Sequence, residues 1–241
     1  MIKEVKTDPD NRMQDWSARF EQLALAARHP ALQKFYNAGV VSAQTPVDSV
    51  QLLAMDVETT GLDAQAHSIV SIGLLPCTLR RIRCQHAQYW VVKPTSELSG
   101  KSVTFHHITH AEILEAPMFE KVFETLLDAM AGKVMVVHYR NIERGFLNQA
   151  FLKHLGEELQ FPVIDTMQLE ARIHRQKQGW LKRLLRRPQQ SIRLADSRAR
   201  YNLPMYHAHH ALTDALATAE LLQAQIATHH GPSVPVGTLW N

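Results

Sequence analysis

Cysteine is scarce in this chain, and long apolar runs are missing. Cys77 and Cys84 are the only cysteines among 241 residues, and they flank an expected hairpin around Arg80 and Arg81. Two thiols fall short of the four ligands of a structural zinc site, so we expect buried thiols rather than a metal site or a disulfide. No stretch approaches the roughly 20 apolar residues of a membrane helix, and residues 1–4 do not begin a signal peptide. The sequence therefore predicts a cytoplasmic protein without a membrane partner.

Charge is small in total but unevenly distributed. The net charge is +3, and 45% hydrophobic residues are enough to fill one good-sized core with an extension. Residues 172–193 contain no acid and eight basic residues, namely Arg172, Arg175, Lys177, Lys182, Arg183, Arg186, Arg187 and Arg193. Interleaved leucines and Trp180 predict a helical piece with one apolar side, ending at Pro188. Such a block is often only a solvated surface, but in a protein that holds a polyanion it is a candidate for phosphate contact.

Two carboxylates follow an expected buried strand. The apolar run at residues 52–55 is typical of a strand covered on both faces. Asp56 and Glu58 come directly after it, and side chains two residues apart on a strand share a face. Like charges held this close are costly unless a cation lies between them. The following Thr-Thr-Gly turn brings hydroxyl and backbone donors that suit phosphate oxygens. A lone Asp-x-Glu would indicate no more than an ordinary strand end, but the full run is more specific.

A second acidic group lies near the C-terminus. His209 and Asp214 stand in the run His-His-Ala-Leu-Thr-Asp, which continues into a stretch rich in Ala and Leu without Gly or Pro. This composition predicts a helix with Asp214 in its first turns and His209 on the preceding loop. An imidazole with a pKa near neutrality suits proton transfer. The alternative is a His-rich helix start with surface imidazoles, since the chain has 14 His.

A third group follows an expected strand at residues 134–137. His138 ends this strand, and Glu143 stands five residues later, just ahead of Phe146 and Leu147. In chain order, the three groups resemble the motifs of the DEDDh 3′–5′ exonucleases. This superfamily includes the proofreading epsilon subunit of bacterial replicases, ribonuclease T and oligoribonuclease. The similarity covers about residues 50 to 228.

The second motif departs from the family pattern His-Asn-Ala-x-Phe-Asp. Tyr139 and Arg140 replace Asn and Ala, Ile142 replaces the aromatic residue, and Glu143 replaces Asp. Glu keeps the charge and adds one methylene, roughly 1.5 Å of reach. We therefore expect activity to survive with an altered metal preference. The alternative is that Glu143 is a solvated helix residue and the site is crippled.

The resemblance implies a two-metal hydrolysis of phosphodiesters. Two Mg²⁺ or Mn²⁺ ions are expected on four carboxylates, those of Asp56, Glu58, Glu143 and Asp214. The resemblance makes His209 the base that takes a proton from the attacking water. Substrate contacts are expected from Val57, Thr59, Thr60, Gly61, Leu62, His106, Ile108 and Ile142, the last three by weaker similarity or position. Asp165, in a run similar to the family's Asp-Thr-x-x-Leu, is expected to cap a helix rather than bind metal.

The chain divides into three expected regions. Residues 1–48 form an N-terminal helical extension, with Trp16, Phe20, Leu23 and Ala27 at helical spacing and a second helix at 31–37. We expect this extension to pack on the core, with a partner-docking arm as the alternative. Residues 49–230 form the exonuclease domain, and residues 231–241 an irregular tail.

The expected fold is α/β. Strands are predicted at residues 52–55, 68–76, 83–92, 134–137 and 163–165, with a helix at 118–130. This order indicates a mixed sheet covered by helices. The resemblance implies the ribonuclease H-like form of it, a mixed five-stranded sheet flanked by helices.

The expected substrate is the 3′ end of a single-stranded nucleic acid. DNA is favoured over RNA, because the motifs are most similar to those of the epsilon-like branch, and the product would be nucleoside 5′-monophosphates. Phosphate contacts are expected from Arg172, Arg175, Lys182, Arg183, Arg186 and Arg187. The alternatives are an exoribonuclease of the same superfamily or a nucleic-acid-binding module with a degenerate site. We expect no stable association with a polymerase, because the stretch after His229 is short.

Overall fold

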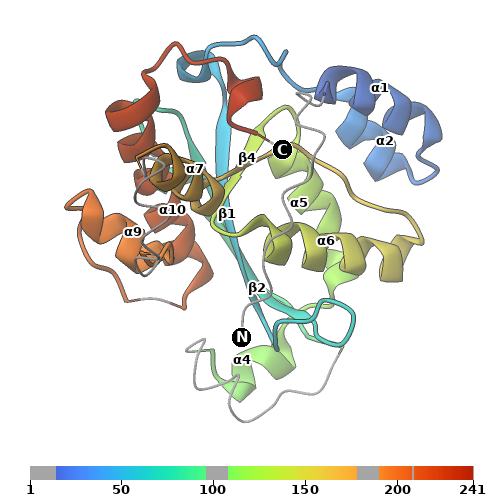
Figure 1. Cartoon of the computed structure of the whole chain (residues 1–241). Helices are drawn as coiled ribbons and strands as arrows, with labels where there is room; N and C mark the ends of the chain where they lie inside the picture. Colours follow the sequence, from blue (N-terminus) through green and yellow to red (C-terminus); the bar gives the residue numbers. More distant parts are fainter. Residues whose placement is uncertain (1–14, 96–107, 178–189, 208, 241) are drawn as a thin grey trace.

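The protein has three layers, a mixed sheet between two groups of helices (Figure 1). The computed structural model describes residues 15–95, 108–177, 190–207 and 209–240. In this part the sheet has five strands in the order β3-β2-β1-β4-β5. The strands are β1 Leu52–Thr59, β2 Ile69–Cys77, β3 Gln88–Val91, β4 Val134–Val137 and β5 Val163–Asp165. β2 is antiparallel to β1 and β3, whereas β4 is parallel to β1 and β5. The predicted mixed five-stranded sheet is confirmed.

Helices cover both faces of this sheet. α10, α7 and α9 lie on one side of it, and α5 and α6 lie on the other (Figure 1). The helices of the described residues are α1 Trp16–Ala26, α2 Pro30–Asn37, α4 His110–Glu115, α5 Phe123–Met130, α6 Arg140–Leu155, α7 Thr166–Lys177, α9 Leu194–Arg200 and α10 Ala211–Gln225. None of these helices is long and apolar enough to span a bilayer.

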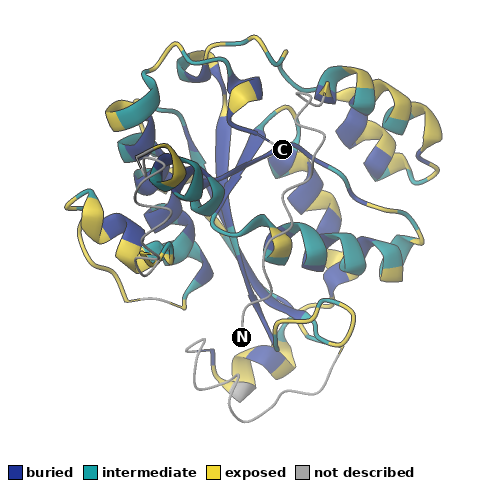
Figure 2. Ribbon diagram, in the orientation of Figure 1, coloured by how far each residue is buried: buried dark blue, intermediate teal, exposed yellow. Residues whose placement is uncertain are grey.

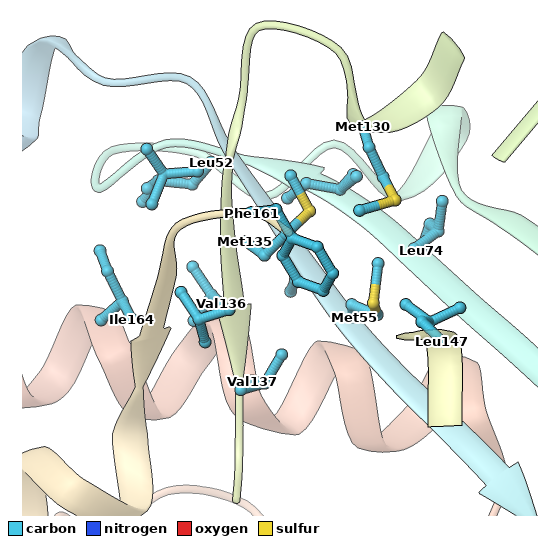
Figure 3. Packing of buried hydrophobic residues seen from close by; sticks show 14 of the residues in the cluster. Leu52, Met55, Leu74, Met130, Met135, Val136, Val137, Leu147, Phe161 and Ile164 are labelled. Carbon is cyan, nitrogen blue, oxygen red and sulfur yellow. The ribbon is translucent and has the colours of Figure 1, made fainter. Parts of the chain in front are cut away.

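The strands form because their side chains are apolar on both faces. In β1 and β4 almost every residue is buried, as expected for strands covered by helices on both sides. Figure 3 shows Met55 of β1, Leu74 of β2 and Leu147 of α6 gathered in one part of the core. Burial follows the strands and the sheet-facing sides of the helices (Figure 2). β1 therefore runs through the middle of the core and ends at the carboxylates.

The N-terminal extension packs on this core, as predicted. α1 and α2 lie side by side next to α5 (Figure 1). The ring of Phe20 on α1 contacts the rings of Trp16, Phe35 and Tyr36, with centroid distances of 5.2–6.2 Å. These aromatic residues belong to the same buried cluster as the sheet. The extension thus shares one hydrophobic core with the rest of the described chain.

The C-terminal tail, expected to be irregular, is packed on the core. It contains a 3₁₀ turn, Val236–Thr238, and its Leu239 and Trp240 are buried. Its backbone pairs with the segment before β1, where the Val236 N–H donates to the Thr45 carbonyl at 2.9 Å. A Cβ atom at Gly237 would lie 2.6 Å from Cβ of Ala43 and 2.9 Å from its carbonyl oxygen, so the two segments pack closely here. The many Pro and Gly residues therefore bend the tail without detaching it.

Three other expectations need correction. The predicted strand at 83–92 begins only at Gln88, because the exposed polar residues before it form a 3₁₀ turn, Cys84–His86. Cys84 is on this turn, so it is exposed, and only Cys77 is a buried thiol. The predicted helix at 118–130 is two pieces, a 3₁₀ turn and α5, divided at Val122, whose φ of −113° departs from helical geometry.

Truncation of Phe20 tests whether the extension is part of the core. We expect Phe20→Ala to lower the free energy of unfolding by about 3–5 kcal/mol, because it removes a buried ring from an aromatic cluster. Leu25→Ala on the same helix is the control, since Leu25 is 90% exposed and a surface change costs less than about 0.5 kcal/mol. Urea unfolding measures both. Equally small effects would show that α1 only rests on the surface.

Candidate active site

Two carboxylates lie together at the end of β1. Asp56 and Glu58 are two residues apart on this strand and share a face of the sheet. Asp56 is half-buried, whereas Glu58 is only 7% exposed. The register between β1 and β2 shifts just after Glu58, so the chain turns away from the sheet at this point. The two acids therefore lie at the edge of the core, where the sheet ends.

Helix α10 brings a third carboxylate and an imidazole to the same place. It begins at Ala211, so Asp214 is in its first turn and His209 on the loop before it, as predicted. The His209 N–H donates to Oδ2 of Asp214 at 2.9 Å. One ligand atom each of Glu58, His209 and Asp214 lie within 4.8 Å of one another. An imidazole nitrogen is thus as close to these two acids as a metal ligand would be.

The loop that leads to His209 is held against α10. Arg198 donates one hydrogen bond to the carbonyl of Pro204 at 2.8 Å and another to Glu220 on α10 at 2.7 Å. Glu220 also accepts a hydrogen bond from the Tyr206 hydroxyl at 3.0 Å. The Arg198 guanidinium lies 4.7 Å from the centroid of the Tyr206 ring. These contacts join the chain before His209 to the helix after it.

The fourth carboxylate, Glu143, is in the first turn of α6. It is 2% exposed. The helix starts after Tyr139, which has a left-handed φ of 89°, a region in which Asn is far more common than a bulky residue. The N–H groups of Tyr139 and Arg140 donate to the carboxylate of Asp165, at 3.1 and 3.2 Å. Backbone hydrogen bonds to an acid at the end of β5 therefore hold an unusual turn.

Asp165 is a cap, as predicted, but it caps two helices. Besides α6, its Oδ1 accepts hydrogen bonds from the N–H groups of Met167 and Gln168 at the start of α7, at 3.0 and 3.3 Å. His138 completes the junction, with Nδ1 at 2.8 Å from the Thr166 hydroxyl and Nε2 at 3.1 Å from the Ile192 carbonyl. Burial lowers the pKa of His138 to about 4, so its imidazole is neutral near pH 7. The junction fixes the entry of α6 and with it Glu143.

The acids of β1, α6 and α10 lie in one electrostatic field. Burial raises the pKa of Asp56 well above its usual range, and the carboxylates of Glu143, Glu58 and Asp214 raise it further. Burial also raises the pKa of Asp214, and the charge of Glu58 adds to this, although the His209 N–H opposes it. Such mutual repulsion is typical of a site that binds a cation or shares a proton.

The donor set suits a hard divalent cation. All four acids offer oxygen atoms, which Mg²⁺ and Mn²⁺ prefer. Burial raises the pKa of Glu143, and its Oε2 is buried with no hydrogen-bond partner among the described residues. A buried carboxylate oxygen without a partner is costly, and a cation would satisfy it. The residues present therefore fit a metal ion.

The residues that are expected to contact substrate differ in their exposure to solvent. Leu62 is 86% exposed beyond the end of β1, whereas Thr59 and Thr60 are buried. The Thr59 hydroxyl donates to the Gly61 carbonyl at 2.7 Å, and the Thr60 hydroxyl accepts from the Ser68 N–H at 3.0 Å. Both hydroxyl groups thus already shape the turn.

The remaining expected contacts lie in apolar surroundings or outside the described chain. Val57 is buried in the core, and Ile142 is packed against it. Ile108 is buried beside Val70 and Ile113. Position 106 and the segment 178–189, with Lys182, Arg183, Arg186 and Arg187, lie outside the described residues.

Arg172 and Arg175, two of the residues expected to contact phosphate, are on α7. Arg172 donates to the Thr238 carbonyl at 2.9 Å and to Oε1 of Gln168 at 3.2 Å, so it joins α7 to the C-terminal tail. Arg175, one turn along, is exposed. Of these two, Arg175 is better placed for a phosphate.

Three residues near the acids, Tyr89, His210 and Gly73, were missed by sequence reasoning. The ring of Tyr89 on β3 stacks on that of His210, with centroids 4.8 Å apart and planes at 17°. Gly73 of β2 lies under the first turn of α10. The histidine pair at 209 and 210 was a signal for His210, but nothing local marked Tyr89 or Gly73.

Comparisons with known proteins show the family of the chain. A family model described as an exonuclease, RNase_T, matches residues 53–222. The chain belongs to this exonuclease family. The predicted membership of the DEDDh 3′–5′ exonuclease superfamily is thereby confirmed.

Curated relatives cover the domain but are longer than the matched part. The PolC-type DNA polymerase III of Lacticaseibacillus paracasei is 28% identical over 181 residues, 73% of this chain and 11% of that protein. The DNA polymerase III subunit epsilon of Pasteurella multocida is 25% identical over 146 residues, 57% of each chain. The chain thus spans about a tenth of the first relative and little more than half of the second.

Solved structures share the fold. The nuclease domain of 3′hExo, a DEDDh family member bound to rAMP, superposes with a TM-score of 0.62 at 14% identity, over 76% of this chain and 94% of that one. Exonuclease X in complex with 5′ overhanging duplex DNA gives 0.58 at 23% identity, over 78% and 99% of the chains. The expected ribonuclease H-like fold is confirmed.

Neutralising Asp56 tests the repulsion among the acids. A carboxyl whose pKa is raised by folding contributes most stability below its unfolded pKa, and this contribution is lost as pH rises through the folded pKa. In a chelator near pH 7, we therefore expect Asp56→Asn to raise Tm by roughly 2–4 °C, about 1 kcal/mol in a chain of this size. The gain should shrink in acid.

Glu124→Gln on α5 is the matched control, because Glu124 is an exposed acid away from this site. We expect its Tm, measured by calorimetry in the same buffers, not to rise, because an acid in the first turn of a helix is stabilising. A lower Tm for Asp56→Asn would contradict the repulsion.

Proposed function

We propose that this protein is a metal-dependent 3′–5′ exonuclease that hydrolyses single-stranded DNA ends to nucleoside 5′-monophosphates. The observation that carries the proposal is the convergence of acids from three elements around Asp56. A possible metal-ligand set lies with them, because one ligand atom each of His209, Glu58 and Asp214 lie within 4.8 Å of one another. Electrostatic repulsion opposes the close approach of these acids from β1, α6 and α10. Binding of a cation would offset this repulsion.

Two divalent cations are proposed on Asp56, Glu58, Glu143 and Asp214. When bound, such ions supply positive charge to the scissile phosphate and lower the pKa of a bound water. The support for this assignment is the oxygen-only donor set and the unpartnered Oε2 of Glu143. Glu143 keeps a buried carboxylate where the family has Asp, which favours a working site over a degenerate one.

His209 is proposed as the general base. It is on an exposed loop, so its imidazole can reach solvent and substrate, while its N–H is anchored to Asp214. A neutral imidazole takes the proton of an attacking water and is worth about 10²–10⁴-fold in rate. Leu62, exposed beyond the end of β1, is proposed to contact the terminal nucleotide.

DNA is proposed over RNA on the names of the curated relatives. Those quoted above are DNA polymerase III proteins. Among the structural neighbours, exonuclease X was solved with DNA and 3′hExo with rAMP, so an exoribonuclease is the second candidate. We further propose that the enzyme works in the cytoplasm without stable polymerase association.

The site assignment is tested on 3′-labelled single strands. We expect Asp56→Ala to abolish hydrolysis with Mg²⁺ or Mn²⁺, because it removes a carboxylate that three others surround. His209→Ala should lower kcat by about 10²–10⁴-fold and keep metal binding, since it removes proton transfer alone. Glu124→Ala is the control for an acid elsewhere. Hydrolysis by Asp56→Ala at the wild-type rate would overturn the assignment, and matched DNA and RNA strands decide the substrate.

The basic segment is tested by its effect on long substrates. We expect neutralisation of Arg183, Arg186 and Arg187 together to raise KM for long strands, flatten its salt dependence and leave dinucleotides unaffected. The physical reason is that each phosphate contact releases counterions from the strand. An unchanged salt slope would mean that this segment is only a solvated surface.

A matched control removes the same charge elsewhere. Arg80, Arg81 and Arg83 are exposed at the turn after β2. Because β2 is antiparallel to β1, this turn lies at the opposite end of the sheet from Glu58. Their triple neutralisation should leave KM and its salt dependence unchanged.

A further inference from the structure

One row of residues crosses the sheet beneath the start of α10. Asp56 of β1 pairs with Gly73 of β2, and Gly73 pairs with Tyr89 of β3. Residues paired in this way across neighbouring strands share a face. The row therefore presents a carboxylate, a gap and an aromatic ring, in that order, to the helix that packs on this face.

The gap at Gly73 is filled by helix backbone. A Cβ there would lie 2.5 Å from the carbonyl carbon of Ala211 and the nitrogen of Leu212. The first turn of α10 thus rests directly on β2, closer than any side chain at this position would permit. On one side of the contact lies the carboxylate group, and on the other lies Tyr89.

Tyr89 meets the residue next to the proposed base. Its ring stacks on His210, with centroids 4.8 Å apart and planes at 17°. The Nδ1 atom of His210 is buried and has no hydrogen-bond partner among the described residues. The orientation of this imidazole therefore depends on packing, and the stack is the packing contact that fixes its plane.

The stack adjoins a strained backbone position. His209 has φ of +71°, in the left-handed region that residues other than glycine seldom adopt. Such a conformation persists only where the surroundings hold it. The His209 N–H is held by Asp214, and the His210 carbonyl accepts from the Asp214 N–H at 3.0 Å. The stack of the Tyr89 ring on His210 is a third contact that restrains this stretch of backbone.

We propose that Tyr89 is a positioning residue for the reaction, acting through His210 to keep His209 beside Glu58 and Asp214. The inference rests on the proposed function, in which His209 is the general base. Without the Tyr89 ring, the backbone of His209 can relax to an ordinary negative φ. Its imidazole would then move away from Glu58 and Asp214. A misplacement of about 1 Å at such a group costs on the order of 10²-fold in rate.

Two substitutions at position 89 separate the stack from general packing. We expect Tyr89→Leu to lower kcat at least about tenfold with little change in KM, because the base moves and strand binding does not. Tyr89→Phe keeps the ring and should retain the wild-type kcat. Gln88→Leu is the matched control, an exposed neighbour on the same edge strand. A wild-type kcat in Tyr89→Leu would overturn the proposal.

Combination with His209→Ala tests whether Tyr89 acts through the base. We expect Tyr89→Leu to cause no further loss in a His209→Ala background, because a group that is absent cannot be misplaced. His210→Ala should reproduce the loss and should not add to Tyr89→Leu, which also covers the case that Tyr89→Leu folds poorly. If Tyr89→Leu lowers kcat by the same factor in the His209→Ala background as in the wild type, the proposal is overturned.

A spectroscopic readout keeps this test separate from the proposed function. In ¹H–¹⁵N spectra of the metal-free protein, the His209 amide should shift in Tyr89→Leu and stay in place in Tyr89→Phe and Gln88→Leu. An unmoved His209 amide in Tyr89→Leu would overturn the positioning role. If the wild type hydrolyses neither DNA nor RNA, the proposed function fails, and this shift still decides whether Tyr89 positions the loop.

Discussion

The structure depends on holding like charges together at the end of one buried strand. Asp56 and Glu58 are fixed by β1, Glu143 by α6 and Asp214 by α10. The charges of the other three raise the pKa of Asp56, and the charge of Glu58 raises the pKa of Asp214. Nothing in the acids themselves brings them together. The apolar core on both faces of β1 does so, because it fixes the strand between two layers of helices. The free energy of burial thus offsets the repulsion among these acids.

Backbone contacts transmit this order to the two helices. α10 lies directly on Gly73, so the distance between Asp214 and β1 is set by main-chain atoms rather than by flexible side chains. α6 is tied through Asp165, whose carboxylate binds N–H groups at the start of both α6 and α7. Asp165 therefore differs from the four acids near it: its oxygens are saturated by donors within the protein. Its hydrogen bonds are satisfied, whereas the buried Oε2 of Glu143 has no hydrogen-bond partner among the described residues.

Local sequence patterns predicted the parts of this site that lie on single elements. The apolar run before Asp56, the Ala-rich helix after His209 and the cap at Asp165 each depend on neighbours in the chain, and the structure agrees with all three. The Gly73 contact and the stack of Tyr89 on His210 could not be predicted in this way. They arise from strand register, which pairs residues that are far apart in sequence and that carry no motif of their own. The break before Gln88 was missed for a related reason, since an edge strand has pairing on one side only.

The segment before β1 and the C-terminal tail lie at the end of β1 away from the acids. The segment before β1 and the tail after α10 pair with each other through their backbones, and Trp240 of the tail forms a bridge to Ile164 of β5. Both therefore close the end of the sheet at which β1 begins. The carboxylates lie at the C-terminal end of β1. The packing of the tail and the group of acids are therefore at opposite ends of this strand. Residues that stabilise the N-terminal end of β1 can vary without touching the acids. Tyr89, in contrast, lies in the same row as Asp56, where a change of packing acts on the site directly.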